Sequence, residues 1–410
     1  MTNKTKTLLA SGLCLLFSSQ IYAQKAPAVV TQANYGGQKQ EAVYSLLPTS
    51  DNAFMLGGTT NSKGAGKIDA WLVKADSEGK VLWDKTFGGA EDDVASDMIK
   101  AQDEGYILAG YTKSKGEGNK DCWLLKVDDA GKMLWQKTYG TPSSDAANQV
   151  VATADGGYLM VGTHHESERQ KKDGIISLDF KHFVWVLKTD AEGNELWRKS
   201  MDSDDVVSIN ELITTTDGGF AVVANTKFKG EKYEDIWVLK LDEEGQKQWE
   251  KVLKGESVDA GNSILQSKDG GYFIGGASYE SGTGNSDAWL VKLDKKGKKS
   301  WDKNFGGKGS DQVYTMLESK DGGYLLGGIS SSGDKAKGSM WLLKTDKKGN
   351  LLWQTTAGKD YFEQIEAIHE TEDGKIIVAG FAPTRYVTEA LPNEKNAGGT
   401  FGDMRFLILK

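Results

Sequence analysis

The stretch from Asp69 to Gly89, DAWLVKADSEGKVLWDKTFGG, is repeated along most of the 410-residue chain. Related copies begin at residues 121, 184, 235, 287 and 340. The second tryptophan of each copy lies at position 83, 135, 197, 249, 301 or 353, so neighbouring copies are 52 residues apart except for one step of 62. All 12 tryptophans belong to these copies. A fixed period of roughly 50 residues is typical of solenoids, propellers and similar arrays.

Each period contains four short apolar runs separated by turn residues. In the first period these runs span residues 44–48, 54–59, 70–74 and 81–87. The turn between the first two runs recurs as DGGY or a close variant, and the turn between the last two recurs as D-x-x-G. Aspartate starts such turns by bonding its own backbone, and glycine supplies the positive φ that they need. Four strands joined by tight turns predict a propeller blade, and no stretch has the periodicity of a helix.

Counting the periods predicts an all-β fold, a seven-bladed β-propeller with four antiparallel strands in each blade. The seventh copy begins near residue 357 but contains only three strand runs. Residues 29–37, VVTQANYGG, align with VLWDKTFGG at residues 81–89 and supply the fourth. We therefore expect residues 28–35 to pair with residues 405–410, which closes the ring and removes its open edges. The predicted blades span about residues 35–86, 87–138, 139–200, 201–252, 253–304, 305–356, and 357–410 with 28–34.

The first 23 residues have the pattern of a secretory signal peptide. Lys4 and Lys6 precede an apolar run at residues 8–17, and Ile21-Tyr22-Ala23 resembles a cleavage site. The sequence therefore predicts cleavage after Ala23 and a secreted or periplasmic protein with a single domain at residues 24–410. The apolar run is too short to span a bilayer, so we expect no membrane insertion.

Charge and cysteine content narrow the classes of partner. The formal net charge is −8, and removal of Lys4 and Lys6 with the signal would leave 48 basic against 58 acidic residues, or −10. An acidic chain disfavours nucleic acid and anionic lipid as partners, since both require a basic face. Cys122 would then be the only cysteine, so no intrachain disulfide can form. Because it precedes Trp123 on a strand, we expect it to be a small buried hydrophobe.

The repeat also resembles known propeller families. The D-x-x-G-x-x-x-W turn at residues 76–83 is similar to the Trp-docking repeat of pyrroloquinoline-quinone-type propellers, although it is one residue shorter. The complete repeat more closely resembles the β-propeller repeats of secreted bacterial envelope and surface proteins, over residues 28–410. This resemblance implies the fold but not a function. Quinone enzymes need dedicated cofactor residues, and none is identified in this sequence, so we expect no cofactor.

A carboxylate recurs at one aligned position in the loop that leads into each inner strand, except in the fourth blade, which has Val207. One interpretation is that each acid accepts bonds from backbone N–H groups of its own turn. The alternative is an acidic collar that binds a basic partner or a hard cation such as Ca²⁺. The residues concerned are Glu41, Asp93, Asp145, Asp259, Asp311 and Glu363.

Two segments between second and third strands, residues 163–183 and 381–405, are longer than the repeat requires. By blade topology they share a face with the carboxylate ring. Long loops on a rigid scaffold often carry function, although a drifted surface insertion is the alternative. Adjacent His164 and His165 would point to opposite sides of a strand, which is poor geometry for a metal, so we predict no metal site. The candidate binding residues are His164, His165, His182, Arg385 and Tyr386.

The sequence carries no established catalytic signature. It lacks G-x-S-x-G, H-E-x-x-H and a P-loop. Carboxylate pairs suited to glycoside hydrolysis remain in the acidic ring, and His369 with Glu366 would suit acid–base chemistry. We therefore expect a monomeric, non-enzymatic scaffold whose long-loop face binds a protein partner or a glycan in the envelope or outside the cell. A carbohydrate- or cation-binding module is the alternative, and a carboxylate-based hydrolase is less favoured.

Overall fold

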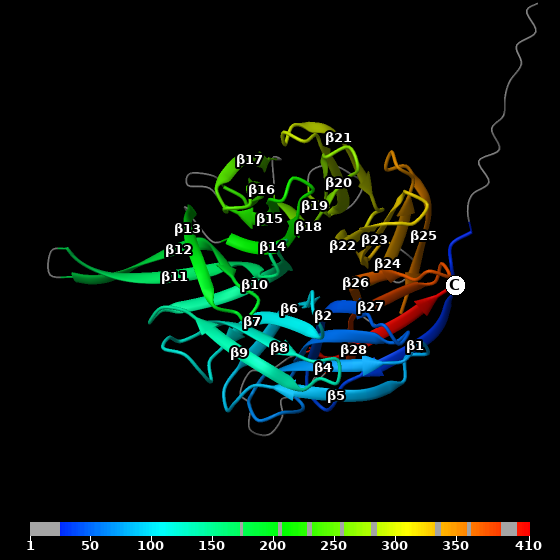
Figure 1. Cartoon of the computed structure of the whole chain (residues 1–410). Coiled ribbons are helices and arrows are strands. Elements are labelled where there is room, and N and C mark those ends of the chain that lie inside the picture. Colours follow the sequence, from blue (N-terminus) through cyan, green and yellow to red (C-terminus); the bar gives the residue numbers. More distant parts are fainter. Residues whose placement is uncertain are drawn as a thin grey trace, which may run out of the picture.

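The strands of this chain form seven four-stranded antiparallel sheets arranged radially around a central axis (Figure 1). Six of the sheets take their strands in chain order, and the seventh combines both ends of the described chain. The predicted fold class is confirmed. The computed structural model describes residues 25–172, 175–203, 207–227, 232–254, 258–279, 285–332, 338–358, 362–386 and 400–410.

The first three blades occupy the N-terminal half of the ring. Blade one consists of β2 (Glu41–Pro48), β3 (Phe54–Thr60), β4 (Asp69–Ala75) and β5 (Val81–Phe87). Blade two consists of β6 (Asp93–Lys100), β7 (Tyr106–Thr112), β8 (Asp121–Val127) and β9 (Met133–Tyr139). Blade three consists of β10 (Ser144–Ala152), β11 (Tyr158–Lys172), β12 (Ile175–Thr189) and β13 (Glu195–Ser203).

The remaining blades complete the ring. Blade four consists of β14 (Val207–Thr214), β15 (Phe220–Thr226), β16 (Asp235–Leu241) and β17 (Lys247–Leu253). Blade five consists of β18 (Asp259–Gln266), β19 (Tyr272–Ser278), β20 (Asp287–Leu293) and β21 (Lys299–Phe305). Blade six consists of β22 (Asp311–Glu318), β23 (Tyr324–Ser330), β24 (Ser339–Thr345) and β25 (Leu351–Ala357). Blade seven consists of β26 (Gln364–Glu370), β27 (Ile376–Tyr386), β28 (Thr400–Leu409) and β1 (Val29–Tyr35).

The two middle strands of a blade are almost entirely buried. Every residue of β15 and β16 is buried, whereas the outer strand β17 is mostly exposed or half-buried. Neighbouring blades cover both faces of the middle strands, so side chains of both alternating sets contact apolar neighbours. This explains why the WLVK-type runs are continuously apolar up to their lysine, as expected for strands buried on both sides.

Tryptophan contacts join consecutive blades. The indole of Trp83 in blade one lies against Gly131 in the D-x-x-G turn of blade two. Gly131 has a φ of 74°, and a Cβ there would lie 2.7 Å from the indole, so the position requires glycine. The same contact recurs between tryptophans 135, 197, 249 and 301 and glycines 193, 245, 297 and 349.

The ring closes as the sequence predicts. β1 pairs with β28 in antiparallel register from Val29 opposite Leu409 to Tyr35 opposite Met404. The Tyr35 hydroxyl donates to the carbonyl of Gly79 at 2.7 Å. This bond between blades seven and one therefore has the same form as an ordinary interface, because Tyr139 of blade two makes the equivalent bond to Gly193 of blade three at 2.6 Å.

The excess residues of blade three form extended strands rather than a loop. β11 and β12 have 15 residues each, whereas the corresponding strands of blade four have seven. The two long strands pair without interruption from Tyr158 opposite Thr189 to Lys172 opposite Ile175, and they project beyond the ring (Figure 1). The excess in blade seven likewise lengthens β27 and β28.

Cys122 lies fully buried in the middle of blade two, as predicted. Burial raises the pKa of its thiol, and its sulfur lies 4.0 Å from that of Met160 in blade three. Within the described residues, no helix has the length and apolar character needed to cross a membrane.

Candidate functional site

The six predicted ring carboxylates lie at equivalent places, within one residue of the start of their inner strands, on the face opposite the DGG and D-x-x-G turns. All six are buried, with exposed fractions of 0–1%. In blades one, two, three and six, one oxygen accepts the backbone N–H of the residue four positions earlier, at 2.6–3.0 Å. The acids therefore hold the loop that connects one blade to the next, which supports the capping interpretation.

A second partner follows each of these acids after 19 residues, at the seventh residue of the second strand. The hydroxyls of Thr60, Thr112 and Ser330 donate to Glu41, Asp93 and Asp311. In blade three the partner is His164, whose Nδ1 lies 2.6 Å from Asp145. Two predicted site residues are thus brought together, and His164 takes the place that threonine or serine takes elsewhere in the repeat.

In blade seven, the ring carboxylate Glu363 has a different hydrogen-bond partner. Residue 382, the nineteenth after Glu363, is alanine. Instead, the guanidinium of Arg405 on β28 bonds Glu363 and also donates from Nε to Asn34 on β1 at 3.1 Å. Arg405 and Glu363 are 3% and 0% exposed, so this ion pair is buried beside the strand that closes the ring.

Binding of Ca²⁺ or of a basic partner by the ring carboxylates stays a prediction. Across the described residues, no three His, Cys, Asp or Glu side chains are grouped so as to hold a metal ion. Ring acids such as Asp93 and Asp311 already accept bonds from a backbone N–H and from two hydroxyls each. A ligand would have to displace those bonds.

The other predicted binding residues lie on the extended strands. His165 on β11 is directly opposite His182 on β12, and their rings meet edge to face with centroids 4.5 Å apart. Burial and the neighbouring His182, His164 and Lys120 lower the pKa of His165. Arg385 and Tyr386 lie at the end of β27, where their backbones pair with residues 401 and 400, and their side chains lie outside the described residues.

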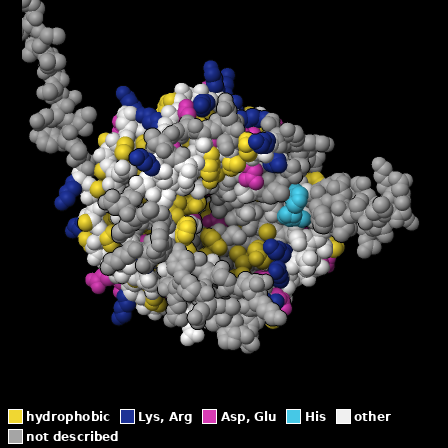
Figure 2. Space-filling view, turned by 180° about the vertical axis from the view of Figure 1, so that it is seen from behind, with side chains coloured by type: hydrophobic (Ala, Val, Ile, Leu, Met, Phe, Trp, Pro, Cys, Tyr) yellow, Lys and Arg dark blue, Asp and Glu magenta, His cyan; other side chains and the backbone are white. Residues whose placement is uncertain are grey.

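Figure 2 shows hydrophobic side chains gathered around the central hollow of the ring. Each inner strand contains one β-bulge. In blade seven the bulged residue is Glu366, and burial raises the pKa of its carboxyl to about 7. Burial, assisted by the Glu366 carboxylate, raises the pKa of Tyr314 to about 12. His369, by contrast, packs edge to face against Phe54 of blade one, with centroids 6.1 Å apart, which gives it a packing role between blades. The bulged positions are Tyr44, Ser96, Asn148, Asn210, Asn262, Tyr314 and Glu366.

A ladder of ion pairs on the DGG-turn face was not predicted from the sequence. In blades one to six, the lysine of the WLVK-type strand is largely buried and bonds the aspartate of the DGG-type turn. The lysine side chains are 2–12% exposed and the aspartates 51–68%. The constant spacing of 23 residues between the partners (33 in blade three) was the available signal. The pairs are Asp51–Lys74, Asp103–Lys126, Asp155–Lys188, Asp217–Lys240, Asp269–Lys292 and Asp321–Lys344.

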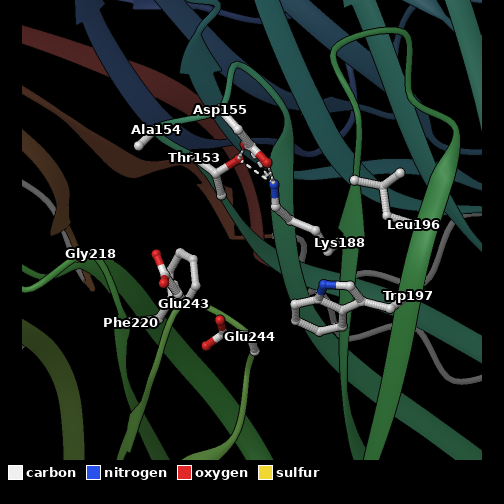
Figure 3. A pocket seen from close by; sticks show the side chains of 10 residues that line it. All are labelled: Thr153, Ala154, Asp155, Lys188, Leu196, Trp197, Gly218, Phe220, Glu243 and Glu244. Carbon is white, nitrogen blue, oxygen red and sulfur yellow. Dashed lines mark hydrogen bonds and ion pairs between the residues drawn. The ribbon is translucent and has the colours of Figure 1, made fainter.

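Grooves open beside this ladder where two blades meet. Between blades three and four, a groove of about 280 Å³ lies against the Asp155–Lys188 pair, with Trp197 in its wall. Figure 3 shows Glu243 and Glu244, from the D-x-x-G turn of blade four, across the groove from that pair. The Lys188 ammonium bonds both oxygens of Asp155 at 2.6 Å and lowers the pKa of Asp155 to about 2. A groove of about 300 Å³ occupies the equivalent place between blades five and six.

Comparison with known proteins supports the fold. No family model matches the chain, and no curated protein matches its sequence. The chain is similar to the Pan2 WD40 domain of Neurospora crassa, with a TM-score of 0.54 and 11% identity over 94% of this chain and 95% of that one. It is also similar to Sqt1 from Chaetomium thermophilum (TM-score 0.48, 13% identity, 87% and 83% covered). An acylaminoacyl peptidase from Pyrococcus horikoshii is similar as well (TM-score 0.46, 12% identity, 83% and 49% covered). At 11% identity, the likeness to the Pan2 WD40 domain is one of fold alone.

Proposed function

We propose that this chain is a non-enzymatic binding scaffold, exported from the cytoplasm, that docks a protein partner on the hairpin formed by β11 and β12. The observation that carries the proposal is the pairing of this hairpin. Its inner part lies within blade three, because β10 pairs with β11 as far as His165 and β13 pairs with β12 as far as His182. Beyond these two histidines, the described strands pair only with each other.

The outer part of the hairpin is therefore a two-stranded arm, residues 166–172 and 175–181. A two-stranded hairpin without further packing is only marginally stable in water. Each of its edges also presents backbone N–H and C=O groups that an extended segment of another protein can pair with. Both properties favour a protein partner over a sugar, because strand addition supplies the missing neighbour. The predicted signal peptide supports a location in the periplasm or outside the cell.

The test is a photo-crosslinking pull-down from envelope extract of the source organism. The bait is residues 24–410, with a photoreactive amino acid at position 169 on the arm. A matched bait carries the same group at position 129, in a D-x-x-G turn of blade two. We expect one partner to crosslink at position 169 and not at position 129.

A third bait checks that the arm itself is required. Residues 167–180 are replaced by Asn-Gly, which allows a two-residue turn between the paired positions 166 and 181. We expect this bait to melt at the temperature of the parent and to lose the partner. Capture of the same partner by the shortened bait would overturn the proposal.

A further inference from the structure

The groove between blades three and four and the groove between blades five and six are equivalent in the repeat, but their net charges are opposite. Their walls correspond position by position across the repeat, with an aspartate–lysine pair, a tryptophan and an aromatic residue in each. Asp155, Lys188, Trp197 and Phe220 of the first groove become Asp269, Lys292, Trp301 and Tyr324 of the second. The charges differ at three further positions of the walls, where Ala154, Glu243 and Glu244 become Lys268, Lys347 and Lys348. Glu318 also lines the second groove, at a position where blade four has Thr214.

This exchange reverses the charge of the groove. The groove between blades three and four has one lysine against three acids, whereas the groove between blades five and six has four lysines against Asp269 and Glu318. Two of those four lysines are already neutralised, because Lys292 pairs with Asp269 at 2.8 Å and Lys268 pairs with Glu318 at 2.7 Å. Lys347 and Lys348 belong to no ion pair among the described residues.

The apolar part of the second groove is ordered by aromatic contacts. Trp301 is half-buried on the outer strand β21 and meets Phe273 edge to face, with centroids 5.6 Å apart. Phe273 in turn packs against Tyr324 of blade six at 4.3 Å. The groove therefore combines a fixed indole surface with two ammonium groups from a single tight turn, Asp346 to Gly349.

We propose that the groove between blades five and six, lined by Trp301, Lys347 and Lys348, binds an acidic segment of a protein partner. Carboxylates of the segment bond the two ammonium groups, and the adjoining aliphatic carbons pack on the indole. A volume of about 300 Å³ suits one or two side chains rather than a folded surface. The chain as a whole is acidic, so an extended polyanion such as nucleic acid is repelled by the surface around the groove. Glu243 and Glu244 repel the same segment from the groove between blades three and four.

The experiment uses a fluorescein-labelled peptide of alternating glutamate and leucine, titrated into residues 24–410 at low salt and read by fluorescence anisotropy. We expect K347E/K348E, which gives the second groove the charge of the first, to weaken binding at least roughly tenfold, since two charge-assisted bonds become repulsions. The reciprocal variant E243K/E244K is expected to gain a second binding site. Raising the salt concentration is expected to weaken both interactions, because exposed charges are screened.

A second measurement locates the peptide without relying on charge reversal. The chain is labelled with 5-fluorotryptophan, and the ¹⁹F signals of Trp301 and Trp197 are assigned with W301F and W197F. We expect the peptide to shift the Trp301 signal and leave that of Trp197 in place. Equal affinity of the parent and K347E/K348E, or a shift of both signals, would overturn the proposal. The arm of blade three takes no part in this site, so loss of residues 167–180 leaves peptide binding unchanged.

Discussion

Blade one and blade seven meet at the closing point of the ring, and they are stabilised by different chemistry. Blade one is continuous in sequence and carries the Asp51–Lys74 pair of the ladder. In blade seven Ile408 takes the place of the ladder lysine, and Asp373 pairs instead with nearby Lys375 at the surface. The blade relies on the buried Glu363–Arg405 pair and on a shared apolar cluster.

That cluster shows how the closing blade is held. It joins Tyr35 from the N-terminal strand and Phe406 from β28 to the core of blade one, including Phe54 and Trp71. A Cβ at Gly79 would lie 3.0 Å from the Phe406 ring, so phenylalanine fills the place at this interface that tryptophan fills elsewhere. A repeat can therefore change the residues at one interface and keep its geometry, provided that the contact with the glycine turn is preserved.

Removal of residues 24–36 is expected to have the largest effect on this interface. The deletion takes away β1, exposes the backbone edge of β28 and opens the cluster around Phe406. We expect the melting temperature to fall by roughly 10 °C or more. A control that lacks only residues 24–27 keeps β1 and is expected to melt like the parent. Identical melting of both deletions, measured by circular dichroism, would show that the ring does not depend on this strand.

Arg405→Met separates the buried ion pair from the rest of the closing blade. It leaves the Glu363 carboxylate buried without its cation, which typically costs about 3–5 kcal/mol of unfolding free energy. The double variant R405M/E363L removes both charges and is expected to recover most of that loss. Urea denaturation of the three proteins gives the comparison. Equal stability of the single and double variants would mean that Glu363 finds another partner when Arg405 is gone.

Asp155→Asn tests the ladder that blade seven lacks. The substitution leaves Lys188 buried beside a neutral amide, and we expect a loss of roughly 1 kcal/mol at neutral pH, because the aspartate is exposed and solvent screens the pair. The folded-state pKa of Asp155 is lowered from 3.8 to about 2, so its stabilisation is present above pH 3.8 and is lost as the pH falls towards 2.

The pH series supplies the control for this prediction. Thermal melts of the parent and D155N are expected to differ at pH 5 and above and to converge as the pH approaches 2. Asp373→Asn in blade seven, where the lysine partner is itself on the surface, is expected to cause a smaller loss. A difference between the parent and D155N that stays constant from pH 6 to pH 2 would contradict a role for the ionised carboxylate.

Two tyrosine substitutions compare the closing interface directly with the interface between blades two and three, and they have the smallest expected effect on stability. Tyr35→Phe removes the hydroxyl bond to Gly79 at the closing point, and Tyr139→Phe removes the equivalent bond to Gly193 between blades two and three. Each is expected to cost about 1 kcal/mol, the usual net value of a buried hydrogen bond. Equal losses in chemical denaturation would show that the closing interface behaves like an internal one. A loss only for Tyr139→Phe would show that the closing strand frays under native conditions.

The sequence predicted the number of blades, the closing strand and the burial of Cys122, because each follows from the position of a residue within the repeat. The ring carboxylates were also found by position, and their partners 19 residues later were visible in the same alignment. The sequence could not decide between backbone capping and cation binding for these carboxylates, because both roles use the same residue types. The burial of all six carboxylates, and their bonds to the backbone N–H groups of Gly37, Gly89 and the equivalent residues, depend on how the loops fold in three dimensions.

Other features depended on strand register and on contacts between blades. Lysine is rarely buried, so the repeat alone does not indicate that the strand lysines are buried and paired. Their pairing requires that the end of the third strand lies beneath the turn between the first two. The insertion of blade three was measured correctly in length, but its continuous pairing and the meeting of His165 with His182 follow from register. The exchange of Glu243 and Glu244 for Lys347 and Lys348 is plain in the sequence, whereas the groove around them is not.

Closure by β1 and β28 also sets the order in which the molecule can be completed. Val29 and Leu409 are neighbours in the sheet although 380 positions separate them along the chain. Joining such distant points in an unfolded chain costs on the order of 5 kcal/mol of entropy, so the contact becomes accessible only after stacked blades have brought the two ends together. During synthesis, six blades can assemble from local contacts before the first strand finds its partner. The ring is finished only when residue 409 has emerged, so the slowest contact to form is also the one that protects the edges of the sheet.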